Sequence, residues 1–568
     1  MIQSYKTLSA AVCALLALPI FGGTASAQTA SQLQPEAPTA PPPSQPPLQT
    51  LPTVPSANLP SDLESLRITP RRLTIDNPPP GMEAQSKALL QTLQGRTLDG
   101  QDIVKTLASL QDLYSTAGFA LVRVILPPKG ATDEELRFLV VDGFIERVTL
   151  DGVPPRLRPR VGGLLQPLVG QSWMRSSALF RQLSLVNEMA GGQIAAALTK
   201  GTGFGGVDLQ VIGRAKPIAA WLATSKSQSP ALGPVESVAG AEISNLAGRG
   251  EQLLVQASGD FSSSFMSADP RYRALLTRLS VPIGARGLTA DLSYVSVSAQ
   301  PTPTADTLPS VSGFRRASTS LRYPWLISEH QRASAFISAE AMTDRQDVAG
   351  HLLGLSLDRL RVARMGIDLS GQRAGWPRAW QVRLVQSVGI NALGARSAAQ
   401  ASPLLPLSRQ NADAHFWNLD MQANAIQPLN QQMSLRLQLQ AQTGYGHALL
   451  RAEQIGLAQN EGLSHLAPGS LQGDDGALAR LEVSRRASFT RLAGEFYAFG
   501  AAGIVRLASP TALERAKMHS QGLGGGIRTQ ILFKNGIRLS MNGEYAAGWR
   551  SDNNKLAKRA RLGLQLSY

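Results

Sequence analysis

The chain has 568 residues, a formal net charge of +15 and one cysteine, Cys13. Because Cys13 falls within a predicted N-terminal signal, the mature chain has no thiol, which excludes disulfides, thiolate catalysis and cysteine metal sites. No apolar run approaches the roughly 18 residues of a membrane-spanning helix. The arginines are dispersed along an exported chain. We therefore expect the charge to line a lumen or face anionic lipid, and we expect no nucleic-acid partner.

Residues 1–27 are predicted to be a secretory signal peptide. Lys6 supplies the positive charge, and Leu8 to Leu18 form an apolar run too short to span a bilayer. Ala25-Ser26-Ala27 is a small-residue cleavage site. Residues 28–62 follow as a proline-rich linker, whose composition indicates a semi-rigid spacer without a core.

The next segment is expected to fold as two small α+β units, residues 63–145 and 146–214. In the first unit, apolar residues recur at helical spacing from Ile103 to Tyr114, with Asp102 placed as a helix cap and Gly118 at the end. Extended segments flank this helix. The second unit opens on the extended segment FIERVTLDG and contains a predicted helix followed by a strand.

Residues 215–568 alternate between apolar and polar side chains. The segment MSLRLQLQAQTGY, Met433 to Tyr445, places Met, Leu and Ala at odd positions and Ser, Arg and Gln at even positions. The final ten residues, RARLGLQLSY, repeat the pattern and end on Tyr568. Such alternation is typical of strands with one face toward lipid and the other toward a wet lumen. A soluble β-sandwich is disfavoured, because the polar face is so consistently Gln, Asn, Ser and Arg.

Connections in this region alternate between short turns and long polar loops. Short turns are predicted at 282–285, 427–431 and 535–536, and long loops at 300–312, 394–414 and 449–476. This layout is typical of an outer-membrane barrel with its turns in the periplasm. About 350 residues at roughly 22 per strand and connection give about 16 strands, if Asp347–Asp358 is a loop. We predict a transmembrane 16-stranded antiparallel β-barrel with two N-terminal periplasmic α+β domains.

The sequence contains no recognisable catalytic constellation. Its six histidines are scattered without ligand spacing, so we expect no metal site. GLGGGIR, Gly522 to Arg528, lacks a strand-to-helix context and a following Lys-Ser/Thr, and is predicted to be a barrel strand with small lumen-facing residues. No Ser-His-Asp set has a recognisable frame. We expect neither an enzyme nor a cofactor.

Four segments resemble the two-partner secretion outer-membrane transporters, the haemolysin and filamentous haemagglutinin secretion and activation proteins. LYSTAGFALVRVILPP and LRFLVVDGFIERVTLDG are similar to that family's POTRA domain, and ISNLAGRGEQLLVQ resembles its first periplasmic hairpin. Leu449 to Val483 resembles the region of its long sixth extracellular loop. The resemblance implies that residues 63–145 and 146–214 are POTRA domains and that 215–568 form the barrel.

The resemblance also implies a pore loop and a partner for it on the barrel wall, with departures. The family's loop arginine falls at Ser464, and its strand aspartate falls at Ala501. Because both charges are missing together, neither would be left unpaired, and the loop must be held differently. The family's plug helix is expected to be missing, because 28–34 is too short for one. The implied pore-loop and wall residues are Ser464, His465, Gly473, Asp474, Gly476, Phe499, Ala501 and Gly503.

The function implied by the resemblance is export of an unfolded partner protein. POTRA strands would capture it by β-augmentation, and the barrel would pass it to the surface of a Gram-negative cell. The expected partners are a secreted β-helical cargo, outer-membrane lipid and the assembly machinery that reads Tyr568, with the transporter itself a monomer. An outer-membrane protein assembly factor is the alternative, and a passive porin is disfavoured because porins need no periplasmic domain. The strand residues assigned to capture are Phe119, Val122, Val124, Leu136, Phe138 and Val140.

Overall fold

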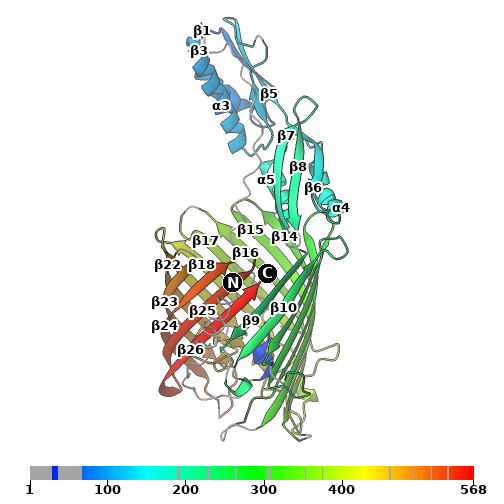
Figure 1. The fold of residues 1–568 in the computed structure, drawn as a ribbon, viewed down its shortest axis with the longest axis vertical. Helices are drawn as coiled ribbons and strands as arrows, with labels where there is room; N and C mark the ends of the chain where they lie inside the picture. The colour runs from blue at the N-terminus through cyan, green and yellow to red at the C-terminus, as the bar shows by residue number, and fades with distance from the viewer. Residues whose placement is uncertain are drawn as a thin grey trace, which may run out of the picture.

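A computed structural model describes residues 29–35 and 67–568, apart from short gaps at 129, 189–191, 216, 227–229, 234, 262–264, 304–308, 352, 374, 459–461, 490–491, 513 and 534–535. The predicted signal peptide and most of the predicted linker therefore lie outside the described residues. Two small α+β units stack end to end above one mouth of a β-barrel (Figure 1).

The first α+β unit packs two helices against a three-stranded sheet in the order β2-β5-β4. Its elements are β1 (Arg67–Ile68), β2 (Arg72–Asp76), α2 (Glu83–Gln91), β3 (Leu98–Asp99), α3 (Gly100–Thr116), β4 (Arg123–Ile125) and β5 (Glu135–Val141). Asp99, rather than the predicted Asp102, caps α3, and its side chain accepts a hydrogen bond of 2.8 Å from the Asp102 amide. The Asp102 carboxylate in turn accepts a hydrogen bond from the Asp99 amide, so the two aspartates form a reciprocal cap.

The second unit has the sheet order β6-β8-β7. Its elements are β6 (Phe144–Gly152), α4 (Arg158–Leu165), a 3₁₀ turn (Gln166–Leu168), α5 (Ser176–Asn187), β7 (Gly192–Lys200) and β8 (Gly206–Ala215). The sequence pattern missed α4 and β7, because RPRVGGLL carries two glycines and GQIAAALTK lacks alternation.

Sixteen antiparallel strands close the barrel, and the last strand pairs with the first as predicted. They are β9 (Ile218–Ser225), β10 (Glu236–Ser244), β11 (Gln252–Gly259), β12 (Tyr272–Ile283), β13 (Leu288–Ala299), β14 (Ser310–Ile327), β15 (Gln331–Val348), β16 (Gly354–Gln372), β17 (Ala379–Gly389), β18 (Trp417–Pro428), β19 (Met433–Thr443), β22 (Asp475–Phe489), β23 (Leu492–Arg506), β24 (Lys517–Leu532), β25 (Arg538–Arg550) and β26 (Asn553–Ser567). The count is as predicted, but the prediction that Asp347–Asp358 is a loop is wrong at its ends, because β16 already begins at Gly354.

The α+β units define the sidedness of the barrel. Arg160 of α4 donates a 2.6 Å hydrogen bond to the Gly284 carbonyl in the β12–β13 turn. Arg181 of α5 donates one of 2.7 Å to the Pro324 carbonyl at the end of β14. The short turns thus face the α+β units, and the long loops lie at the opposite mouth. The predicted hairpin turn keeps Gly536 at a φ of 82°, whereas Asn535 lies outside the described residues.

The N-terminal segment lies inside the barrel. Residues Ala30–Leu33 form one 3₁₀ turn, η1, whose Ala30 amide donates a 2.9 Å hydrogen bond to the Ser312 hydroxyl on β14. The Tyr272 hydroxyl on β12 donates a 3.1 Å bond to the Leu33 carbonyl. Ala30 is 0% exposed and Leu33 is 4% exposed. This single turn fills part of the lumen.

Candidate functional site

The connection between β19 and β22, residues 444–474, folds back into the barrel, and we call it loop 6. Within it, two short strands of two residues each, β20 (Ile455–Gly456) and β21 (Gln472–Gly473), pair antiparallel. Its apolar side chains form a cluster with the barrel wall, in which Leu457, Leu463 and Leu471 are all 0% exposed. Loop 6 is therefore packed inside the lumen and does not extend into solvent as a surface loop.

Arg480 of β22 holds the tip of loop 6. Its guanidinium donates a 2.8 Å hydrogen bond to the Ser464 hydroxyl, and Ser464 is 1% exposed. The same guanidinium pairs with Glu544 of β25 at 2.8 Å and with Glu482 at 3.3 Å. It also lies over the Phe499 ring, 3.5 Å from the centroid.

The strand register relates this contact to the arginine–aspartate pair that the resemblance implies at Ser464 and Ala501. Arg480 is the cross-strand partner of Ala501, so the wall arginine stands beside the position that carries the family's aspartate. Relative to the pattern that the resemblance implies, the polarity is reversed, because the wall supplies the cation and the loop supplies a neutral acceptor. Neither missing charge leaves a buried partner without compensation.

Glycines on two neighbouring strands make room for His465. The imidazole Nε2 lies 2.8 Å from the Ser520 hydroxyl of β24, which itself donates to the Trp549 carbonyl at 2.8 Å. The imidazole is therefore the donor at Nε2. A Cβ at Gly522 would lie 2.7 Å from Cε1 of His465, and one at Gly548 would lie 2.6 Å from Nε2. Gly522 of GLGGGIR thus permits close packing of the loop, whereas Gly524 and Gly526 lie against Phe499 and Tyr497 of β23.

Of the three glycines assigned to the site, Gly476 and Gly503 face loop 6 from the wall, and Gly473 lies within the loop. A Cβ on Gly503 would lie 2.8 Å from Cδ1 of Leu457, and one on Gly476 would lie 2.9 Å from Cγ2 of Ile455. Gly473 lies in β21, where a Cβ would approach Val505 to 2.8 Å. Among the eight assigned residues, Ser464, His465, Phe499, Ala501 and Gly503 lie at the contact between the tip of loop 6 and the wall, whereas Gly473, Asp474 and Gly476 lie where loop 6 joins β22.

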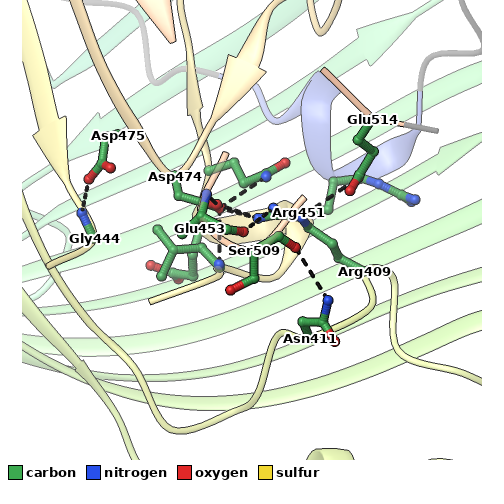
Figure 2. Close-up of polar contacts among 12 residues, drawn as sticks. Arg409, Asn411, Gly444, Arg451, Glu453, Asp474, Asp475, Ser509 and Glu514 are labelled. Atoms are coloured by element: carbon green, nitrogen blue, oxygen red, sulfur yellow. Dashed lines mark hydrogen bonds and ion pairs between the residues drawn. The ribbon is translucent and has the colours of Figure 1, made fainter. Parts of the chain in front are cut away.

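A second anchor lies where loop 6 joins β22, near the extracellular mouth (Figure 2). Asp474 is 0% exposed and forms an ion pair with Arg409 of the β17–β18 loop. Its carboxylate also accepts hydrogen bonds from the Leu449 amide at 3.0 Å and from the Ala508 amide at 2.7 Å. One carboxylate therefore links three extracellular loops.

A third anchor pairs an acid on loop 6 with an arginine on the barrel wall. Glu453 of loop 6 forms an ion pair with Arg364 of β16 at 2.7 Å. It also accepts a hydrogen bond of 3.2 Å from the side-chain amide of Asn418 on β18. Arg364 also pairs with Glu340 of β15 at 3.1 Å. Loop 6 and the N-terminal turn meet as well, through a 2.8 Å bond from Gln32 to Gln472. The two segments thus occupy the lumen together.

The strands assigned to cargo capture are only partly available for pairing. Leu136, Phe138 and Val140 lie on β5, which is the central strand, paired with β2 and β4 on its two sides. This part of the assignment is wrong, because a strand without a free edge cannot accept a further strand. Side chains from all the assigned residues pack in the core; Phe119, for example, is 3% exposed and packs edge-on against Trp173.

The edge strand β4, which contains Val124, is already occupied by a side chain. Gln111 of α3 donates a 2.7 Å hydrogen bond to the Val122 carbonyl and accepts one of 3.1 Å from the Val124 amide. Its carboxamide therefore mimics one residue of a neighbouring strand. The opposite edge of this sheet is β2.

Sequence reasoning missed Arg480, Glu544, Arg364, Glu453, Arg409 and Gln111. Alternation predicts that Arg480 faces the lumen, yet its partners follow only from the register across several strands. Within the described ranges, no three His, Cys, Asp or Glu side chains gather as a metal site. Among those same residues, no helix is long and apolar enough to cross a membrane.

Comparison with known families identifies this architecture. The profile of the haemolysin secretion/activation proteins ShlB/FhaC/HecB matches residues 205–529, and the ShlB-type POTRA domain matches residues 73–143. The chain belongs to the ShlB/FhaC/HecB family. It is an outer-membrane transporter of the two-partner secretion type, with POTRA domains in the periplasm, and its family exports a secreted partner protein.

Solved structures share the fold of this transporter at low sequence identity. CdiB from Escherichia coli aligns with a TM-score of 0.68 at 14% identity, covering 90% of this chain and 93% of that one. CdiB from Acinetobacter baumannii aligns at 0.59 and 14% identity, covering 100% and 97%. BamA from Haemophilus ducreyi lacking POTRA domains 1–3 aligns at 0.51 and 12% identity, covering 89% and 100%. No curated protein sequence matches the chain.

Proposed function

We propose that this transporter captures an unfolded β-helical partner on its POTRA domains, in a Gram-negative periplasm, and passes it through the barrel lumen as a monomeric pore. The observation that carries the proposal is the arrangement of the lumen. A polar wall encloses two segments, loop 6 and η1, that are held by side-chain contacts and can in principle be displaced without breaking the barrel.

Capture would use free strand edges of the POTRA sheets. Main-chain hydrogen bonds at an edge bind an extended chain without requiring a particular sequence. In the first POTRA domain, Gln111 blocks β4, so β2 is the available edge. In the second domain, β7 is an edge strand of its sheet. The proposal therefore places the capture of a cargo strand at β2 and β7.

The seam of the barrel supports a second candidate function, that of an outer-membrane assembly factor. β26 and β9 share a register of five residue pairs, Gly563 to Ser567 against Ser225 to Trp221. The neighbouring β25–β26 register contains twelve pairs. A short seam is the part of the wall that opens at the lowest cost, as an insertion factor would require. Tyr568 ends this strand and is the residue we propose for recognition by the assembly machinery.

Disulfides introduced into the thiol-free mature chain distinguish the two functions. Ala223 and Gln565 are cross-strand partners, so cysteines there would lock the seam under oxidation. Cysteines at Ala30 and Ser312, which are hydrogen-bonded neighbours, would lock η1 to the wall. Surface appearance of a cognate partner is measured in oxidised and reduced cells.

Export through the lumen predicts that the seam lock leaves secretion intact and that the η1 lock stops it. The reverse result would favour the assembly factor and overturn the export proposal. Each single-cysteine variant controls for the substitution itself, and recovery in reductant controls for assembly of the barrel.

A further inference from the structure

Two basic residues stand directly opposite each other on the outer face of the barrel. Arg506 ends β23 and Lys517 begins β24, and the two are cross-strand partners at the extracellular rim. Both side chains are exposed. Their parity is that of the lipid-facing residues Ile504 and Leu523, which are 37% and 70% exposed. The two cations therefore point outward, away from the lumen.

One acid, Asp475, stands opposite Arg506 in the register, on the side away from Lys517. Like charges directly opposite each other on a strand pair are destabilising. Within the described ranges, neither side chain has an acidic partner within 4.0 Å. The carboxylate of Asp475, the partner of Arg506 on the other side, accepts from the Thr443 hydroxyl at 3.1 Å and the Gly444 amide at 2.8 Å. A bound anion would supply the missing charge.

An open hollow of about 630 Å³ lies beside Arg506. Its lining residues are Thr443, Tyr445, Gly446, Asp475, Arg506, Ala508 and Ser509. They provide hydroxyl, carboxylate and guanidinium groups next to the aromatic ring of Tyr445, which is 54% exposed. Hydroxyl-rich sugar rings match such a lining, because their edges hydrogen-bond and their faces stack on aromatic rings.

The depth of the pair relative to the membrane can be read from Trp549. This side chain is 52% exposed on the outer face of β25 and pairs in register with Gln521 of β24. Exposed tryptophans mark the membrane interface of such barrels. Lys517 lies four residues further out than Gln521, which at about 3.3 Å per residue is roughly 13 Å along the strand. The pair therefore lies outside the tryptophan belt, on the extracellular side, within reach of groups that project from the outer leaflet.

We propose that this rim binds the phosphorylated sugar headgroup of an outer-leaflet glycolipid, lipid A of lipopolysaccharide. A phosphate lies between Arg506 and Lys517, and the adjoining glucosamine occupies the hollow beside Tyr445 and Asp475. The proposal depends on the outer-membrane placement of the barrel and not on the route that the cargo takes. Phosphate groups pair strongly with such cations, because both charges and several hydrogen bonds contribute.

Binding to the purified full chain in detergent tests the proposal, with bisphosphorylated lipid A, dephosphorylated lipid A and inorganic phosphate as probes. We expect the double variant Arg506→Gln, Lys517→Gln to bind bisphosphorylated lipid A at least tenfold more weakly than the parent. The control Lys87→Gln, Arg485→Gln removes the same charge elsewhere and should bind as the parent does. Heat modifiability verifies that each barrel is assembled, and the single variant Lys517→Gln should give an intermediate loss.

Three results would overturn the proposal. The first is equal binding of the phosphorylated and dephosphorylated lipids by the parent chain. The second is an equal loss of binding in the control variant. The third is competition by inorganic phosphate as effective as that by lipid A, which would indicate a general anion site instead.

Discussion

The guanidinium of Arg480 lies 2.8 Å from the hydroxyl of Ser464, and this contact joins the barrel wall to the tip of loop 6. Arg480 is also the common partner of Glu482 and Glu544, so it holds the loop and neutralises the wall at once. The tip of loop 6, held by a neutral hydroxyl, can move away without leaving an unpaired charge on itself, whereas Glu453 and Asp474 hold the rest of the loop by ion pairs. The cost of displacing the tip is therefore lower than for a loop that carries its own buried arginine.

The first prediction concerns the contribution of Arg480 to the stability of the barrel. Arg480→Met should lower assembly sharply, because Glu544 and part of Glu482 would remain buried without their cation, a loss of about 3–5 kcal/mol. Ser464→Ala should cost only about 1–2 kcal/mol, because Arg480 keeps both carboxylates. The temperature of heat modification measures the difference. Equal midpoints for the two variants would contradict the central role given to Arg480.

The second prediction concerns the charges that the family places at Ser464 and Ala501. Ala501→Asp should be tolerated, because the new carboxylate would stand opposite Arg480 in the register. Ser464→Arg should impair assembly, because it would bring a second guanidinium against Arg480. Adding Ala501→Asp to Ser464→Arg should recover part of the loss. Fractions of heat-modifiable barrel in the three variants give the coupling, and additive effects would mean that the two positions do not interact.

These contacts also mark how far sequence alone can predict the site. The period-2 pattern predicted the barrel, its strand number and the closure at β26, because each strand reports its own two faces. The resemblance to the family, and not the pattern, implied that Ser464 lies against the wall, where it accepts a hydrogen bond from Arg480. The pattern could not identify Arg480, because the partner of a lumen residue depends on strand register and loop path. Gln111 was missed for the same reason, since its partners lie on β4 rather than on its own helix.

The third prediction uses the glycine cradle of His465. Gly522→Ala should displace the loop tip, because its Cβ would come within 2.7 Å of the imidazole Cε1. Truncating the ring with His465→Ala should relieve most of that clash. Protease sensitivity of loop 6 in the purified protein reports the displacement. If Gly522→Ala is as sensitive with His465→Ala as without it, the strain lies in the strand and not in the loop contact.

The fourth prediction compares two adjacent aspartates. Asp474→Asn leaves the buried Arg409 with the more distant Glu514, 3.8 Å away, as its acidic partner and should loosen the three loops joined there, at up to about 3–5 kcal/mol. Asp475→Asn, one residue away, loses only contacts to Thr443 and Gly444 and should have a small effect. Single-channel conductance in planar bilayers is the measurement. More frequent or larger openings are expected for Asp474→Asn alone, and identical traces from both variants would argue against an extracellular latch.

The last prediction concerns pH and the second POTRA domain. Hydrogen bonds from the Gly203 amide and the Thr202 side chain hold the pKa of the Glu146 carboxyl below its usual value of 4.5. A carboxyl with a lowered folded-state pKa stabilises the fold above its unfolded pKa, and that contribution is lost as the pH falls through the folded value. Glu146 therefore holds the turn at residues 201–206 by hydrogen bonds at neutral pH but not in acid. This turn carries Phe204, whose side chain is 76% exposed.

We expect the hydrogen-exchange protection of the Thr202 and Gly203 amides to fall as the pH drops below about 4.5. Glu146→Gln should have lower protection at neutral pH and should lose this pH dependence, because its amide oxygen accepts hydrogen bonds without a charge to titrate. Exchange is followed by mass spectrometry of the full chain, corrected for intrinsic rates at each pH. A pH profile that is the same in the parent and in Glu146→Gln would show that another group controls the turn.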